Sequence, residues 1–187
     1  MAPAGATVVR GLSSGPDADL YKLEVMLGAA ISLARKQVRI VTPYFLPDAR
    51  LQFVIAQAVL RGVQVDIVLP QHSDQHLMDW AMGAHIRFFR HVGARFHLTP
   101  GPFDHTKLAT VDGQWSLIGS SNWDARSFRL NFEFDLECYD AGFTATLDTL
   151  VTDRIARGQE LTPEDLLARP AWKRLRDAAA RLLMPYL

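Results

Sequence analysis

The residues with the clearest chemical meaning lie between positions 105 and 122. His105 and Lys107 are two apart in one short run of β-forming residues, and Gly119-Ser120-Ser121-Asn122 follows a second run. Asp112-Gly113, between the two runs, is a strong signal for a hairpin turn. Because alternate residues of a strand project from the same face, the hairpin predicts an imidazole, an ammonium, a hydroxyl and a carboxamide near one end of a sheet.

These four side chains suit the binding and attack of a phosphate group. Lys107 and Asn122 can bind its non-bridging oxygens, and the hydroxyl of Ser120 adds a further donor. The imidazole of His105 can attack phosphorus as a nucleophile. The alternative is a polar sheet edge without chemistry, and for Ser120 a simple turn hydroxyl is an equally good interpretation.

The elements that position these residues alternate along the chain. Hydrophobic periodicity predicts helices over 19–36, 48–61, 74–91, 143–157 and 163–183, and strands over 38–42, 63–69, 94–98, 107–111, 115–118 and 132–139. Asp17 or Asp19 is the expected cap of the first helix. The first strand, helix and strand predict a parallel pair. We therefore predict an α/β sandwich with a mixed, mostly parallel sheet and helices on both faces.

The composition limits the class of protein. The chain has 187 residues, 20 Lys and Arg against 20 Asp and Glu, and 49% hydrophobic residues, which fits a single domain over 1–187. A net charge of zero argues against nucleic acid as a partner. The single Cys138 allows no internal disulfide. The longest weakly polar stretch, 25–34, is too short to span a membrane.

The spacing of the motif is similar to that of a known superfamily. His105-x-Lys107-x4-Asp112-x6-Gly119-Ser120-x-Asn122 resembles the HKD signature of the phospholipase D superfamily at every fixed position. The resemblance implies that His105 forms a phosphohistidine, that its neighbours in the motif hold the phosphoryl oxygens, and that no metal or other cofactor is needed. It also counts Asp112 among the catalytic residues, although in that superfamily this Asp mainly supports a turn or a salt bridge.

A wider similarity narrows the resemblance to one family. Segments 42–47, 61–80 and 122–133 and the tail 172–187 look like the C-terminal half of bacterial cardiolipin synthases. Those enzymes carry N-terminal membrane helices and a first copy of the motif, and this sequence contains neither. The reaction needs a nucleophile and a general acid on opposite sides of phosphorus. We therefore expect one half of a two-motif enzyme, or a homodimer.

Glu133 stands 28 residues after His105, where small single-motif members carry an acid that orients a catalytic imidazole. The resemblance implies that it hydrogen-bonds an Nδ1 atom, with the histidine of the opposite half as one candidate. The alternative is a solvent-facing residue of an alternating strand, which is what we expect of Asp135 and Glu137.

Three further groups of residues have weaker chemical interpretations. His72 and His76 are four apart, yet no third ligand stands at metal spacing, so we expect no metal site. The arginines and phenylalanines between 87 and 95 form either a solvated helix face, which is the favoured interpretation, or a basic aromatic surface for lipid headgroups or nucleic acid. Trp80 and Trp123 are expected to pack against other side chains.

The resemblance implies a bacterial phosphatidyltransferase. It would move the phosphatidyl group of one phosphatidylglycerol, through phosphohistidine, to the glycerol hydroxyl of another. The implied partners are an anionic phospholipid and a second motif-bearing half, with peripheral contact at the cytoplasmic side of a membrane. The alternatives are a phospholipase D, a phosphodiesterase or nuclease acting as a homodimer, and a catalytically silent module that binds anionic headgroups.

Overall fold

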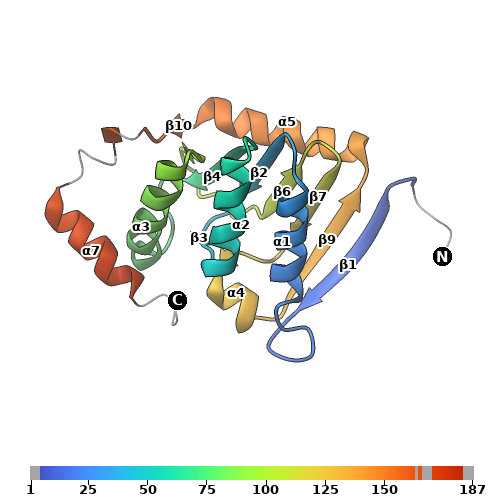
Figure 1. Ribbon diagram of the computed structural model, residues 1–187, viewed down its shortest axis with the longest axis horizontal. Coiled ribbons are helices and arrows are strands. Elements are labelled where there is room, and N and C mark those ends of the chain that lie inside the picture. The colour runs from blue at the N-terminus through green and yellow to red at the C-terminus, as the bar shows by residue number, and fades with distance from the viewer. Residues whose placement is uncertain (1–4, 163, 166–169, 183–187) are drawn as a thin grey trace.

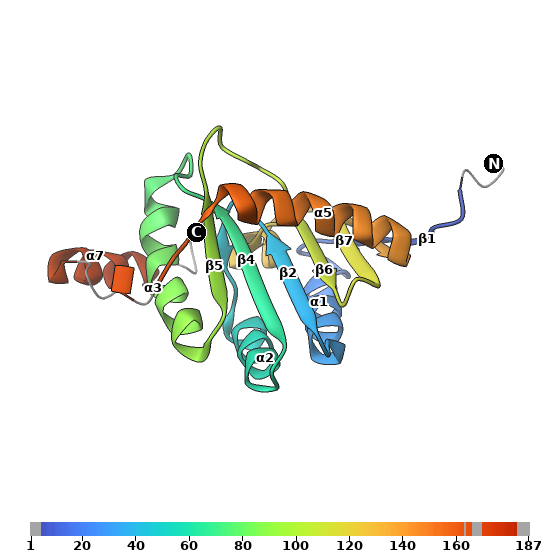
Figure 2. The same cartoon turned by 90° about the horizontal axis from the view of Figure 1, so that it is seen from above.

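The protein folds around one large sheet with helices on both of its faces (Figures 1 and 2). The structure is a computed structural model that describes residues 5–162, 164–165 and 170–182. In spatial order, the sheet contains β1 (Val8–Ser14), β9 (Glu133–Tyr139), β7 (Trp115–Gly119), β6 (Leu108–Val111), β2 (Gln37–Val41), β4 (Gln64–Pro70), β5 (Arg95–Thr99) and β10 (Gln159–Glu160). A second, two-stranded sheet pairs β3 (Phe45–Leu46) with β8 (Trp123–Asp124).

The helices divide between the two faces of the sheet. In the described part of the chain they are α1 (Lys22–Leu33), α2 (Ala49–Leu60), α3 (His76–Val92), α4 (Ala125–Arg129), α5 (Ala141–Arg157) and α7 (Ala171–Arg181). Figure 2 shows α1, α2 and α3 on one face and α5 across the other. Of the helix predicted over 163–183, residues 171–181 form α7, which packs beside α3. Pro170 precedes this helix and is not part of it, and residues 163, 166–169 and 183 lie outside the described residues.

Alternating strand residues supply the two hydrophobic layers. Ile40 and Ile67 pack in the larger core, toward α1, α2 and α3. Their neighbours Val41 and Val68 pack in the smaller core, with Val151 of α5. This alternation is the period of two that strands impose, so both faces of β2 and β4 are buried.

The predicted α/β sandwich with a mixed sheet is confirmed, but the expectation that most pairs are parallel is wrong. Among the described strands of the large sheet, only β2 with β4 and β4 with β5 run parallel, and in the small sheet β3 and β8 are parallel too. The other five neighbouring pairs of the large sheet are antiparallel. After β5 the chain continues through the β6–β7 hairpin, which is antiparallel by its connection, and the unpredicted β1 pairs antiparallel with β9.

The N-terminal caps of two helices differ in how they are built. The Asp48 side chain caps α2 by accepting from the N–H groups of Arg50 and Leu51 at 3.0 and 3.1 Å. The predicted cap of α1 is wrong: Tyr21 occupies that position with φ 66°. Asp19 instead accepts hydrogen bonds from the side chains of Ser13 and Lys22, so its carboxylate is used in the loop before the helix.

No helix in the described part of the chain combines the length and the apolar character needed to cross a membrane.

Candidate active site

The motif residues meet at one edge of the sheet. His105 and Lys107 directly precede β6, Ser120 and Asn122 directly follow β7, and Glu133 begins β9. Since β6 and β9 both run antiparallel to β7, the start of β6, the end of β7 and the start of β9 share an edge. The short helix α4 lies at the same edge (Figure 1).

The imidazole and the ammonium are in direct contact. Lys107 Nζ lies 3.0 Å from Nδ1 and 3.3 Å from Nε2 of His105, and it donates to the backbone oxygen of His105 at 2.9 Å. The ring of Tyr44 meets the imidazole edge to face at 6.3 Å, and Phe103 lies 5.7 Å from it on another side. The histidine therefore has a defined position beside a cation.

Burial changes the acid–base behaviour of Lys107. Loss of hydration lowers the pKa of this ammonium below its ordinary value, and the nearby carboxylates of Glu133 and Asp124 oppose the shift. A cation held among carboxylates but partly removed from water is a strong electrostatic partner for an incoming anion.

Glu133 is held by residues of its own chain. The Ser120 hydroxyl donates to one carboxylate oxygen, and the side-chain amide of Asn131 donates to the other at 3.2 Å. Ser120 also accepts from the N–H of Phe134 at 3.0 Å. Within this chain, Nδ1 of His105 contacts Lys107 and not Glu133, so contact of Glu133 with an imidazole stays a prediction for an opposite half.

A close approach of β7 and β9 fixes the turn before Asn122. Gly119 lies opposite Asp135 in the strand register, and a Cβ atom at Gly119 would lie 2.6 Å from the Asp135 Cα. Asp135 accepts hydrogen bonds from the hydroxyl and the N–H of Ser121. Burial raises the pKa of Asp135, although the bonds from Ser121 favour its charged form.

Asp135 and Glu137 are each 1% exposed, so the expectation that they face solvent is wrong. The alternation of β9 is present but inverted, because Phe132 and Phe134 at its start are 74% and 57% exposed. The acidic side chains are tolerated inside because each has hydrogen-bond donors around it.

A cavity of about 400 Å³ opens beside His105. Its lining includes the motif residues His105 and Asn122, and Oδ1 of Asn122 is buried without a hydrogen-bond partner among the described residues. Side chains from outside the motif complete the lining: Tyr44, Asp74, Gln75, Met78, Asp124, Arg126, Ser127 and Asn131. These residues have no motif spacing of their own, and their only signal in the sequence is that they lie in segments 42–47, 61–80 and 122–133.

Asp112 lies away from this cavity, at the other end of β6. Its carboxylate accepts from the N–H groups of Arg35, Lys36 and Gln37, each at 2.8 Å. Five residue steps along β6, at roughly 3.3 Å each, separate it from Lys107 by about 16 Å. Asp112 therefore does not join the cluster around His105, and it links the hairpin turn to the start of β2.

The arginines and phenylalanines between 87 and 95 were considered as a basic aromatic surface, and the histidines as a metal site. Arg95 pairs with Asp66 at 2.7 Å and Arg90 with Glu160 at 3.2 Å, while Phe89 is fully buried, so no continuous basic aromatic surface forms there. No group of three or more His, Cys, Asp or Glu side chains in the described ranges is arranged to hold a metal ion. Metal independence itself stays a prediction. Trp123 stacks on Phe45 in the core, as expected.

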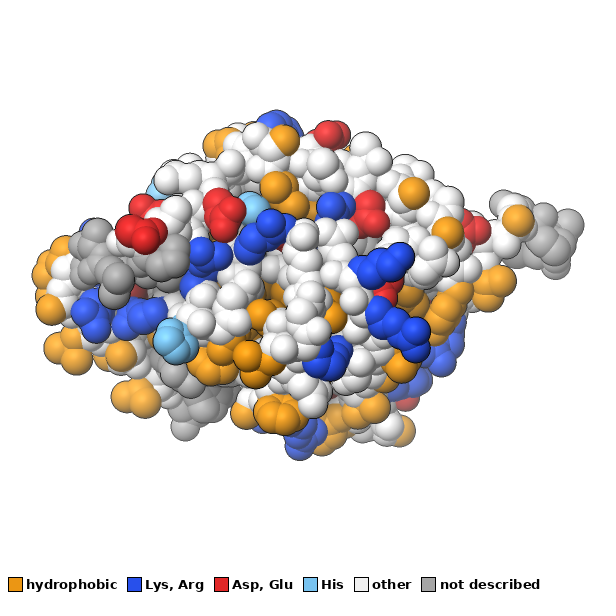
Figure 3. Space-filling model, turned by 45° about the horizontal axis from the view of Figure 1, so that its top comes forward, with side chains coloured by type: hydrophobic (Ala, Val, Ile, Leu, Met, Phe, Trp, Pro, Cys, Tyr) orange, Lys and Arg blue, Asp and Glu red, His pale blue; other side chains and the backbone are white. Residues whose placement is uncertain are grey.

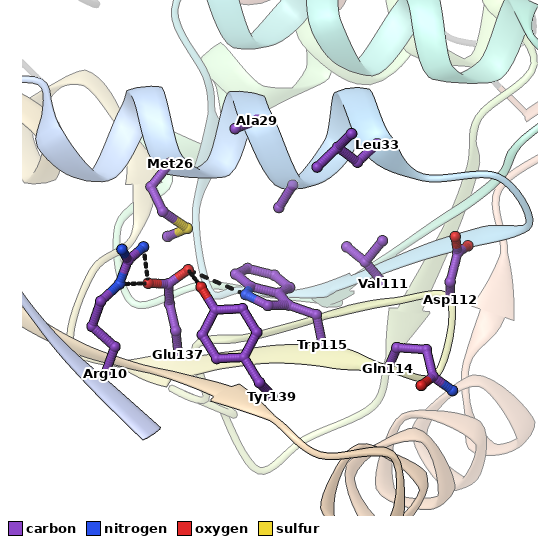
Figure 4. A pocket seen from close by; sticks show the side chains of 11 residues that line it. Arg10, Met26, Ala29, Leu33, Val111, Asp112, Gln114, Trp115, Glu137 and Tyr139 are labelled. Carbon is purple, nitrogen blue, oxygen red and sulfur yellow. Dashed lines mark hydrogen bonds and ion pairs between the residues drawn. The ribbon is translucent and has the colours of Figure 1, made fainter. Parts of the chain in front are cut away.

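Figure 4 shows a second cavity, of about 390 Å³, beneath α1. Glu137 in its wall accepts hydrogen bonds from Trp115 Nε1 at 3.2 Å and from the Tyr139 hydroxyl at 2.9 Å, and it pairs with Arg10. His105, Lys107 and Asn122 are absent from its lining. This cavity is therefore separate from the candidate active site.

Comparison with known proteins identifies the family. Residues 27–154 match the family described as "Cardiolipin synthase, PLD-like domain". The chain belongs to this family. It is 33% identical over 185 residues to the major cardiolipin synthase ClsA of Bacillus subtilis. This alignment covers 99% of this chain and 38% of that protein. It is 36% identical over 179 residues to cardiolipin synthase A of Edwardsiella ictaluri. Here the alignment covers 96% of this chain and 37% of that protein. The chain thus spans less than two fifths of the length of these curated relatives.

Solved structures confirm the phospholipase D fold predicted for this cardiolipin synthase-like domain. The phosphatidylserine synthase of Haemophilus influenzae superimposes with a TM-score of 0.77 at 20% identity, over 97% of this chain and 48% of that one. Nuc of Salmonella typhimurium, a phospholipase D family member, gives a TM-score of 0.71 at 19% identity, over 84% of this chain and 99% of that one.

Proposed function

We propose that this domain is the motif-bearing catalytic half of a cardiolipin synthase-like phosphatidyltransferase. The observation that carries the proposal is the contact of His105 with Lys107 at the cavity of about 400 Å³, which Asn122 also lines. Membership in the cardiolipin synthase family supports a phospholipid as the substrate.

The first step transfers the phosphatidyl group to the enzyme. A ring nitrogen of His105 attacks the phosphorus of phosphatidylglycerol, a P–N bond forms, and the bond to the glycerol oxygen breaks. The leaving oxygen takes a proton from a general acid on the opposite side. Lys107 and Asn122 stabilise the charge on the non-bridging oxygens, each by about 3 to 4 kcal/mol in the transition state.

The second step transfers the group to the acceptor. The glycerol hydroxyl of another phosphatidylglycerol attacks the phosphohistidine, its proton passes to the same general acid, now acting as a base, and the P–N bond breaks. His105 cannot stand on both sides of one phosphorus. The general acid is therefore the histidine of a second motif-bearing half, supplied by a homodimer or by a domain outside this chain.

The proposal assigns the domain to the cytoplasmic face of a membrane, held by lipid contact or by a segment outside this chain. A nuclease is less well supported. The net charge of the chain is zero, and on the face seen in Figure 3 basic side chains are interspersed with acidic ones and form no continuous stripe.

A substrate with a good leaving group tests the nucleophile without the second half. The anion of p-nitrophenol leaves without a proton, so a p-nitrophenyl phosphodiester should phosphorylate His105 even in a monomer. We expect one equivalent of p-nitrophenol in a burst and label on His105, in chelator as well as in buffer. His105→Asn is the control without the nucleophile. Binding without label would favour the silent headgroup module, and cleavage of DNA without lipid transfer would favour the nuclease.

A further inference from the structure

The cavity beside His105 contains a cation that the motif does not account for. Arg126 of α4 lines this cavity, and its side chain has no hydrogen bond or ion pair among the residues that the structure describes. Arg129, one turn further along the same helix, pairs with Asp48 at 3.4 Å and lies over the ring of Tyr21 at 5.8 Å. One arginine of α4 is therefore engaged in the fold, while the other is left for a ligand.

A buried hydroxyl accompanies this arginine. Ser127 is only 1% exposed and lines the same cavity, and its Oγ has no hydrogen-bond partner within 3.5 Å among the described residues, although it interacts electrostatically with Asp124. Buried hydroxyls are normally hydrogen-bonded. A hydroxyl without a close hydrogen bond beside an unpaired guanidinium indicates a place for an anion with several acceptor oxygens, because guanidinium donors match phosphate in geometry.

The two acidic residues of the cavity, Asp74 and Asp124, each accept a hydrogen bond from another residue of the chain. Asp74 accepts a hydrogen bond from the Tyr44 hydroxyl. Asp124 accepts from the N–H of Ser127 at 2.7 Å, and burial raises the pKa of this carboxyl, which favours its uncharged form. Neither residue forms an ion pair with Arg126, so the guanidinium stays available to an anion.

The size of the cavity fits two phosphates joined through one glycerol. Six single bonds of about 1.5 Å separate the two phosphorus atoms in such a product, which places them no more than about 8 Å apart. A cube of about 400 Å³ has an edge of about 7 Å, so a cavity of this volume reaches from one phosphate to the next. His105 stands at the first position, and Arg126 with Ser127 offers the second.

We propose that Arg126 and Ser127 bind the phosphate of the acceptor lipid, and that this subsite selects a phosphate-bearing alcohol over water as the acceptor. The inference rests on the proposed function and adds the chemical class of the second substrate. Arg126 contacts only the acceptor, so it has no part in the attack of His105 on the donor.

The test in turnover uses two soluble acceptors that differ by one phosphate. Phosphatidyl transfer from labelled phosphatidylglycerol is measured to glycerol 3-phosphate, to glycerol and to water. We expect the intact protein to prefer glycerol 3-phosphate, and Arg126→Gln to lose about tenfold of this preference through a higher KM for that acceptor. The burst with the p-nitrophenyl phosphodiester is the reference for an intact donor site, and it should equal the wild-type burst in a variant outside the cavity. Arg129→Gln, the matched control on the same helix, should keep the wild-type preference.

A binding experiment tests the subsite even if no turnover occurs. Lys107→Met removes the cation of the donor site, and the amide signals of Ser127 and Asn122 are followed by NMR as glycerol 3-phosphate or glycerol is added. We expect saturable shifts with glycerol 3-phosphate alone, and about tenfold weaker binding when Arg126→Gln is added to Lys107→Met. Equal affinity with and without Arg126 would overturn the subsite. Label on His105 together with an unchanged acceptor preference would overturn it while leaving the proposed function intact.

Discussion

At the scale of single residues, the site depends on how close two strands approach. Gly119 has no Cβ atom, and Asp135 of β9 fills the space that one would need. The hydroxyl and N–H of Ser121 then bind the Asp135 carboxylate, which fixes the chain one residue before Asn122. A glycine and a buried aspartate without direct substrate contact thus determine where the amide lies.

Gly119→Ala should therefore reduce both stability and activity. The added methyl group forces β7 and β9 apart, and overpacking of this kind costs about 1 to 3 kcal/mol. Urea denaturation measures the loss. Gly28→Ala is the matched control, because a Cβ atom at Gly28 meets nothing within 4 Å; this change in α1 should stabilise the helix by up to about 1 kcal/mol. Equal stability of Gly119→Ala and wild type would show that the strands separate freely.

Lys107 should set the alkaline limit of the reaction. Burial lowers the pKa of its ammonium, so the proton is lost at a lower pH than from an ordinary lysine. The rate of His105 labelling should then fall with rising pH before the ordinary lysine range is reached. Lys107→Met should lose about 10² to 10³ in rate. Lys107→Arg should remove the alkaline fall without full recovery of rate, because the guanidinium is broader. An alkaline fall that persists in Lys107→Arg would assign it to another group.

At the scale of elements, the hairpin turn anchors the chain between α1 and β2. Asp112 accepts three N–H groups there, and it adopts φ 54° beside Gly113 at φ 68°. Positive φ at both central residues is the geometry of a type I′ β-turn over 111–114, in which the N–H of Gln114 donates to the Val111 oxygen at 3.0 Å. Asp112 thus lies in the hairpin turn and also binds the backbone N–H groups at the start of β2.

Asp112→Asn should lower the free energy of unfolding by about 1 to 3 kcal/mol at neutral pH, because an amide cannot accept three N–H groups as a carboxylate does. Burial raises the pKa of Asp112, but the bonds from Gln37, Arg35 and Lys36 outweigh it and hold the pKa below 3.8. Its contribution is therefore present above that value and lost as pH falls through the folded-state pKa. Denaturation at pH 7 and pH 3 should show a difference between variant and wild type that shrinks in acid. If the difference in unfolding free energy were the same at both pH values, the effect would come from the shape of the side chain and not from its charge.

Helix α5 controls the loop that carries His105. Arg154 donates to Asp104 at 2.7 Å and to the Thr106 hydroxyl at 3.2 Å, and so binds the residues on either side of the histidine. The N–H of Thr106 also donates to Asp104 at 2.9 Å. The clamp fixes the backbone of His105 from both directions.

Arg154→Gln should slow labelling of His105 by up to about 10², the cost of a displacement near 1 Å, with KM unchanged. Amide hydrogen exchange at Thr106 should become faster. Arg157→Gln is the control from the same helix, because within the described part of the chain Arg157 donates only to the Asp153 backbone oxygen. Unchanged exchange at Thr106 would contradict the positioning role.

The features that sequence predicted correctly are the local ones. The hairpin turn at Asp112-Gly113 depends on two adjacent residues, so its signal is visible in a short window. Strand β1 was missed because its partner β9 lies more than 120 residues away, and Gly11 in β1 is explained only by the Phe134 ring, which would lie 2.9 Å from an added Cβ atom. The inverted alternation of β9 has the same cause, since the donors that stabilise its acids come from other elements.

At the scale of the whole molecule, a single motif supplies one histidine for a reaction that needs two. A monomer should release p-nitrophenol from the activated diester but fail to transfer phosphatidylglycerol, whose alkoxide needs a proton to leave. Light scattering at several concentrations, run beside both assays, separates the two reactions. Full transfer of phosphatidylglycerol by a strictly monomeric sample would refute the need for a second histidine.

Among the strands that the structure describes, β1 stands at the edge of the large sheet, with β9 as its only neighbour. Its other side leaves backbone groups open, and Val8 and Val9 are 65% and 48% exposed. An edge of this kind can add a strand from a second molecule. Two copies joined there would scatter light as a dimer without sharing a phosphate between their His105 rings. Mass alone therefore does not identify the active pair. Introducing a charge with Val9→Lys should abolish association through the edge and leave transfer activity unchanged.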